Sequence, residues 1–141
     1  MIIVSACLLG INTRYDGKDA FCQAVIDELK GKTIIPVCPE QLGGLSTPRP
    51  RSEIIGGEGK DVLEGRANVK VEFGGDVSDK FTKGAKEVLK IAKLTGATKA
   101  FLKEKSPSCG VDTIRRGKEC VHGSGVTAAL LKKEGFELKG F

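Results

Sequence analysis

Cysteine is the residue type with the most informative placement in this sequence, which has five cysteines among 141 residues. Three of the five, Cys7, Cys38 and Cys109, follow short apolar runs that are typical of buried β-strands. These runs are Ile2–Ala6, Thr33–Val37 and Lys99–Lys103. Deprotonated cysteine is a ligand of zinc and of the iron in iron–sulfur clusters. The spacing therefore raises the question of which fold could bring the three thiols together.

A parallel sheet would do so, because the carboxyl ends of its strands meet at one edge, where such folds bind ligands. Free cysteine is often only a small buried apolar residue. Three cysteines at successive strand ends, however, favour a shared site. Cys22 falls within a predicted helix and Cys120 falls late in a loop, so we expect neither of them to belong to that site.

The remaining elements are those that a parallel sheet requires. Apolar periodicity predicts helices over Ala20–Lys30, Asp76–Gly96 and Gly125–Lys133, and a last strand over Phe136–Lys139. In the first helix Phe21 and Ala24 share the apolar face with Val25 and Leu29. In the second, Asp76 or Ser78 can cap the start and Gly96 ends it. Strands and helices alternate, which predicts an α/β fold with a small parallel sheet and right-handed crossovers.

Between the second strand and the long helix lies an irregular stretch, Pro39–Gly75, that is rich in proline and glycine. We predict short extended pieces within it at Ile54-Ile55, Val62-Leu63 and Val69–Phe73. Long irregular segments in small proteins tend to be functional. The total length suits one domain spanning residues 1–141.

The composition argues against two classes of protein, nucleic-acid binders and membrane-spanning proteins. Lysine and arginine outnumber the acidic residues 23 to 18, a basic excess too mild and too scattered for a nucleic-acid binder. Aromatic residues make up 5% of the chain, and no stacking strip of the kind that single-strand binders use is visible. The segment Met1–Ala6 has no basic leader, so we expect no signal peptide, and no apolar run suits a membrane span. We therefore expect a cytoplasmic protein with free thiols or metal-bound cysteines.

Spacing alone leaves the kind of metal open. Structural zinc has four ligands, usually including a closely spaced cysteine pair that this sequence lacks. His122 could supply a fourth ligand to three cysteines. Alternatively, three thiolates on a four-iron cluster leave one iron free, which gives a Lewis acid an open position. Both kinds of site remain compatible with the pattern.

The segments around the cysteines resemble the TudS-like thiouracil desulfidases, a family of small bacterial and archaeal domains. The resemblance covers essentially the whole chain. It rests on Ser5–Gly10, Arg14–Gly17, Pro36–Leu45 with Thr47–Arg49, Ser106–Gly110 and Gly125–Leu131. It implies a Rossmann-like, three-layer α/β domain that holds a 4Fe–4S cluster on Cys7, Cys38 and Cys109. It also implies non-redox removal of sulfur from 2-thiouracil or a related small thiolated pyrimidine, with release of hydrogen sulfide.

Two further residues enter as catalytic candidates. Glu40 is the carboxylate nearest in sequence to a predicted ligand and suits an acid/base role, which the resemblance also implies. A helix N-terminal carboxylate is its structural alternative. The resemblance implies a functional serine at Ser108, although Ser106 is easily confused with it and a turn hydroxyl is an equal alternative.

Other roles for the same residues stay open. A carrier of sulfur or iron could use the same cluster site, and a zinc protein with a basic surface could contact RNA. Tyr15 could stack on a pyrimidine. Arg49 and Arg51 either line the pocket or are solvated.

Overall fold

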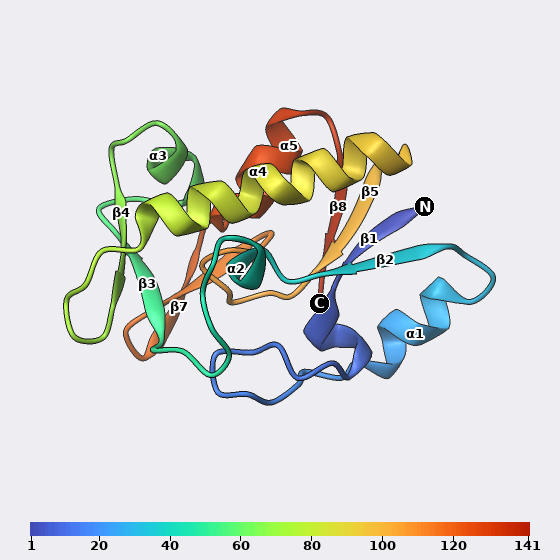
Figure 1. The fold of residues 1–141 in the computed structure, drawn as a ribbon, viewed down its shortest axis with the longest axis horizontal. Helices are drawn as coiled ribbons and strands as arrows, with labels where there is room; N and C mark the ends of the chain where they lie inside the picture. Colours follow the sequence, from blue (N-terminus) through green and yellow to red (C-terminus); the bar gives the residue numbers. More distant parts are fainter.

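A computed structural model describes every residue from Met1 to Phe141. Its centre is a sheet of four parallel strands in the order β2-β1-β5-β8 (Figure 1). The strands are β1 (Ile2–Ser5), β2 (Ile34–Val37), β5 (Lys99–Leu102) and β8 (Glu137–Gly140). All four residues of β1 and three of the four in β5 are buried, whereas the edge strands are only partly covered. Continuous apolar runs are typical of strands covered on both faces.

Helices cover both faces of the sheet and form three layers (Figure 1). On one face lie α4 (Ser78–Thr95) and α5 (Val126–Lys133), which pack on Ile3, Ala100 and Leu102. On the other face α1 (Gln23–Leu29) packs on Ile2, Val4 and Phe101. The predicted α/β class with a mostly parallel sheet is confirmed.

Two antiparallel hairpins extend the structure beyond the sheet, at the left of Figure 1. One pairs β3 (Ser52–Ile55) with β4 (Asn68–Val71), with α3 (Gly59–Leu63) between them. The other pairs β6 (Thr113–Arg116) with β7 (Glu119–His122). Two short helical turns follow the first two sheet strands: the 3₁₀ helix η1 (Ala6–Leu9) and α2 (Pro39–Leu42).

A second hydrophobic cluster joins the hairpins to the long helices. It contains Ile54 and Val69 from the first hairpin, Ile114 from the second, and Phe81 from α4. The long helix therefore carries apolar side chains for both clusters. None of the helices is both long and apolar enough to cross a lipid bilayer.

Several predicted elements are confirmed within one or two residues: the four sheet strands, α4 and α5. The first helix starts at Gln23 rather than Ala20, because the Asp19 carboxylate accepts the Phe21 amide and holds a turn there. The prediction that Phe21 and Ala24 lie on a buried face is wrong, since both are exposed.

The sequence patterns also misplaced two segments. The predicted extended piece Val62-Leu63 is wrong, because these residues lie in α3. Glu58 and Asp61 form a capping box that begins this helix, and Val62 packs into the second cluster. The β6–β7 hairpin was expected only as loop, since its residues Thr113–His122 carry little apolar alternation.

Candidate functional site

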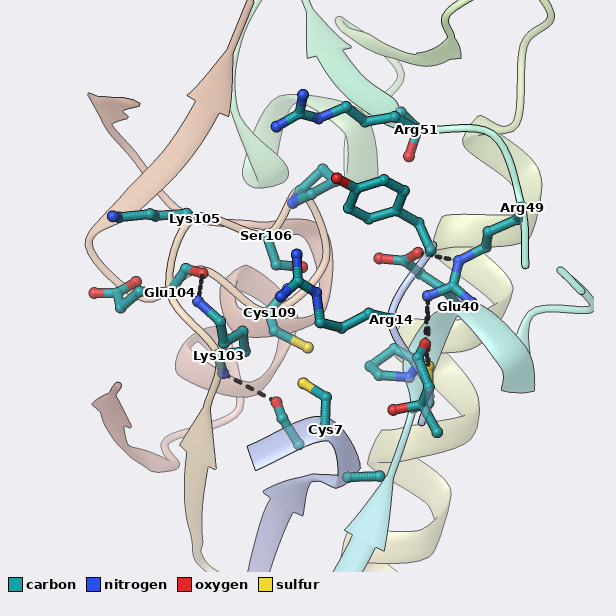
Figure 2. Close-up of a pocket in the computed structure, with 18 of the residues that line it drawn as sticks. Cys7, Arg14, Glu40, Arg49, Arg51, Lys103, Glu104, Lys105, Ser106 and Cys109 are labelled. Atoms are coloured by element: carbon teal, nitrogen blue, oxygen red, sulfur yellow. Dashed lines mark hydrogen bonds and ion pairs between the residues drawn. The ribbon is translucent and has the colours of Figure 1, made fainter. Parts of the chain in front are cut away.

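A cavity of about 360 Å³ opens at the carboxyl edge of the sheet (Figure 2). The chain leaves the central strand β1 for β2 on one side and later returns to β5 on the other, which is where open α/β sheets form ligand crevices. Cys7, Cys38 and Cys109 all line this cavity. In Figure 2 the sulfur atoms of Cys7 and Cys109 point toward each other. Residues that are up to about a hundred positions apart in sequence are thus assembled by three neighbouring strands.

Local backbone structure presents each thiol. Cys7 lies in η1, which Gly10 ends with a φ of 88°, a left-handed conformation that suits glycine. Cys38 is the residue before α2. In the loop after β5, the Ser106 hydroxyl accepts the backbone amides of Ser108 and Cys109, at 3.1 and 3.0 Å. These turns leave the three side chains facing one space.

The thiols are mostly buried, and burial sets their ionisation. Burial raises the pKa of Cys7 to about 11, although the positive charge of Lys103 opposes the rise. Burial likewise raises the pKa of Cys38 and of Cys109 above the usual thiol value. Without a metal, the three groups are therefore neutral thiols at pH 7, and metal binding must displace their protons.

Glu40 reaches the same cavity from the first turn of α2. This short helix lies against α4 where two glycines meet: a Cβ on Gly43 would lie 2.0 Å from the Lys80 carbonyl oxygen, and one on Gly84 would lie 2.0 Å from that of Pro39. Only residues without a side chain permit this approach. The long helix thereby fixes the element that carries Glu40.

The Glu40 carboxylate is paired with a buried arginine. Its Oε2 accepts a hydrogen bond of 2.6 Å from Arg49 Nε, and the side chains are 13% and 5% exposed, respectively. Arg49 therefore lines the cavity and is not solvated, which decides between the two alternatives left by the sequence. Arg51 lines the cavity as well.

Further cationic side chains surround the cavity, and most were not singled out from the sequence. They are Arg14, Lys103, Lys105 and Arg115. Lys103 follows β5 directly, so its place at the sheet edge was readable, whereas Arg115 arrives on the unpredicted hairpin. Tyr15 also lines the cavity, and the guanidinium carbons of Arg14 and Arg51 lie 5.8 and 5.6 Å from its ring centroid.

Four residues considered from the sequence lie elsewhere. Ser108 does not line the cavity: its hydroxyl is buried 3.0 Å from that of Thr127 in α5. Ser106 is the serine of this loop that lines the cavity. Cys120 is exposed in β7. Cys22 precedes α1 and packs against the apolar residues between α1 and the sheet, which include Val4 and Phe101. His122 is exposed and does not join the three cysteines.

The donor set suits an iron–sulfur cluster. Three thiols face one cavity, whereas no three His, Cys, Asp or Glu side chains are close enough together to share a single metal ion. A four-iron cluster binds each thiolate through a different iron, so its ligands need not converge on one point. Cys7, Cys38 and Cys109 therefore fit such a group.

Fold and site together define a Rossmann-like α/β protein with a thiol-lined cavity at the switch point of its sheet. The chain belongs to the 2-thiouracil desulfurase family, whose sequence profile matches residues 2–140. It is 45% identical over 141 residues to the uncharacterized protein YbbK of Bacillus subtilis strain 168, covering 98% of this chain and 93% of that protein.

A solved structure is similar over nearly the whole chain. It is that of the [4Fe-4S]-dependent thiouracil desulfidase TudS, with a TM-score of 0.83 and 39% sequence identity. The match covers 99% of this chain and 89% of the TudS chain. The predicted family is therefore confirmed.

Proposed function

We propose that this protein is a 4Fe–4S-dependent desulfidase that converts 2-thiouracil, or a related small thiolated pyrimidine, to the corresponding oxo compound. The observation that carries the proposal is the meeting of Cys7, Cys38 and Cys109 with the Glu40 carboxylate in one cavity. Family membership and the similarity to TudS support the same activity. The reaction consumes one water, breaks the carbon–sulfur bond, forms a carbon–oxygen bond and releases hydrogen sulfide, with no net electron transfer.

The three cysteines would hold the cluster. When bound, it supplies a soft Lewis acid with one iron free of protein ligands, suited to a thione sulfur. Buried thiols must lose their protons to bind it, and the cations around the cavity favour the thiolate form. Lys103 acts on Cys7 in this way, and Arg49 on Cys38.

Glu40 is the proposed acid/base residue. Arg49 binds its Oε2, and its Oε1 accepts no hydrogen bond from the protein. The free oxygen can take a proton from the attacking water and later return it to the departing sulfur. The Arg49 pair keeps the carboxylate in one orientation, which proton transfer to a bound molecule requires.

The role of a serine remains a prediction. A catalytic Ser108 would need its buried hydroxyl to leave Thr127, whereas Ser106 lies at the cavity wall. The Ser106 hydroxyl accepts two amides of the Cys109 loop and can still donate its own proton. We therefore include both residues in the proposal and separate them by mutation below.

The proposal also covers the cellular location, the size of the substrate and the domain organisation. All five cysteines are free, as expected in a reducing compartment, and we place the protein in the cytoplasm. We propose a small nucleobase rather than a nucleic acid as substrate, because a cavity of about 360 Å³ suits a small molecule. We further propose one domain over residues 1–141, since α4 carries side chains of both large apolar clusters.

Anaerobic purification followed by iron and sulfide quantitation tests the proposal. We expect about four irons and four acid-labile sulfides per chain, and sulfide release from 2-thiouracil that depends on the cluster. A colourless protein that binds one zinc under the same conditions would contradict the cluster. A loaded protein that releases no sulfide would favour a carrier of iron or sulfur instead.

A further inference from the structure

Arg49 makes more side-chain hydrogen bonds than any other residue that lines the cavity. Its guanidinium group is almost fully buried, with 5% of the side chain exposed. Burying a cation costs free energy unless hydrogen-bonding or ionic partners compensate it. The partners of Arg49 therefore indicate which parts of the site it holds in place. The Arg49 side chain has five hydrogen-bond partners: Glu40 Oε2, Thr13 O, Thr47 Oγ1, Ser46 O and Cys38 Sγ.

Two of these partners belong to the proposed site. Nε donates to Glu40 at 2.6 Å, and Nη2 lies 3.9 Å from the sulfur of Cys38. One rigid planar group thus contacts both the acid/base carboxylate and a cluster ligand. Arginine can do this because its donors have a fixed geometry, whereas the single ammonium of lysine cannot span the same set.

The remaining partners anchor the guanidinium itself. Nη2 also donates to the Thr13 carbonyl at 2.8 Å, and Nη1 donates to the Thr47 hydroxyl at 2.8 Å. The Arg49 backbone amide donates to Tyr15 O at 2.8 Å, so two cavity-lining segments are tied at this residue. Arg49 is therefore held independently of Glu40 and Cys38.

We infer that Arg49 is a positioning residue that fixes the Glu40 carboxylate relative to the Cys38 sulfur. This inference rests on the proposed function. Arg49 need not touch substrate: it acts by holding the acid/base group beside the ligand. Its positive charge beside Cys38 also stabilises negative charge on the sulfur, and hydrogen bonds to cluster sulfurs are among the features that set a cluster's reduction potential.

The test compares substitutions at three arginines that differ in whether they line the cavity and whether they contact Glu40 and Cys38. Arg49→Met removes both contacts, and Arg49→Lys keeps the charge without the planar geometry. Arg51→Met removes a cavity cation for which no contact with Glu40 or Cys38 is found, and Arg66→Met breaks an exposed pair with Asp61 outside the cavity. Each protein is loaded anaerobically, and its iron and sulfide content, kcat, KM and reduction potential are measured.

We expect both Arg49 variants to retain the cluster and to lose kcat by about 10- to 100-fold, the usual effect of removing a partner of a metal ligand. Their KM for 2-thiouracil should stay within about threefold, because substrate binding is not the lost interaction. The reduction potential of Arg49→Met should fall, since the reduced cluster is the more negative state, whereas that of Arg51→Met should shift less. Arg66→Met should match the wild type in all four measurements.

Wild-type kcat and potential in loaded Arg49→Met would overturn the inference. Loss of the cluster in both Arg49 variants would also overturn it, because Arg49 would then be needed for folding or loading rather than for placement. If the wild-type protein itself releases no sulfide, the proposed function fails. The potentials of loaded Arg49→Met and Arg51→Met then still test the contact of Arg49 with Cys38, and equal shifts in the two variants would overturn that part of the inference.

Discussion

The backbone amide of Lys103 donates a hydrogen bond of 3.0 Å to the hydroxyl of Ser5, which precedes it by 98 positions. Ser5 ends β1 and is 2% exposed, and Lys103 follows β5. The bond therefore joins the carboxyl ends of β1 and β5. The chain continues from β1 to Cys7 and from β5 to Cys109. Burial raises the pKa of Cys109, and a hydrogen bond from Ser5 partly opposes that rise.

Replacing this hydroxyl should destabilise the metal-free protein. Ser5→Ala leaves the partly buried Lys103 amide without its acceptor beside the buried end of β1, so we expect the free energy of unfolding to fall by about 1–3 kcal/mol. Urea unfolding followed by circular dichroism measures the change. Ser46→Ala is the matched control, because the Ser46 hydroxyl bonds the Pro48 carbonyl in an exposed loop and its loss should cost less than about 0.5 kcal/mol. Equal losses in the two variants would contradict the assigned role of Ser5.

We expect three of the five cysteines to be needed for retaining the cluster and two to be dispensable. Cys7→Ala, Cys38→Ala and Cys109→Ala should each fail to retain a full cluster, because each removes one of the three thiols that line the cavity. Cys22→Ala and Cys120→Ala should load like the wild type, since neither residue lines it. Iron and sulfide per chain after anaerobic reconstitution are the measurements. A full cluster in any of the first three variants would remove that residue from the ligand set.

Glu40→Gln should separate catalysis from cluster binding. The amide keeps the size of the side chain but cannot accept a proton, so we expect turnover to fall by about 100- to 10,000-fold with the cluster retained. Sulfide release and visible absorbance are measured on the same sample. Glu87→Gln serves as the control, since Glu87 pairs with Lys90 on the outer surface of α4. Undiminished turnover in Glu40→Gln would exclude Glu40 as the base.

The two serines of the Cys109 loop should also behave differently. Ser106→Ala removes a cavity-lining hydroxyl and the acceptor for the Ser108 and Cys109 amides, so we expect turnover and cluster retention to decrease. Ser108→Ala breaks the buried pair with Thr127, which predicts lower stability, by about 1–3 kcal/mol. Steady-state kinetics and thermal unfolding of both variants are compared. If Ser108→Ala loses turnover without losing stability, Ser108 is the catalytic serine.

Acid should destabilise the start of α4 through Asp76. Hydrogen bonds from the Ser78 hydroxyl and amide hold the pKa of Asp76 below the usual aspartate value. Because the folded-state pKa is the lower one, the stabilisation is present above the pKa of the unfolded chain and is lost as the pH falls through the folded value. Asp76→Asn should therefore flatten the dependence of unfolding free energy on pH below about pH 4. An unchanged acid profile in this variant would contradict the assignment.

Much of the fold was readable because it depends on local patterns. Short apolar runs separated by helices with glycine ends predict a parallel sheet, and they place Cys7, Cys38 and Cys109 at its carboxyl edge. The Val62-Leu63 segment was misread because two apolar residues have no period, and a capping box and burial then favoured α3. The β6–β7 hairpin has too little apolar alternation to be recognised.

The sequence by itself thus determined the family, the sheet and the grouping of the three thiols, because strand direction alone brings strand ends together. Only the tertiary structure decided that Arg49 pairs with Glu40, and that Ser106 rather than Ser108 lines the cavity. These placements depend on how loops distant in sequence pack against α4 and α5. Such contacts between loops leave no periodic signal in a single sequence.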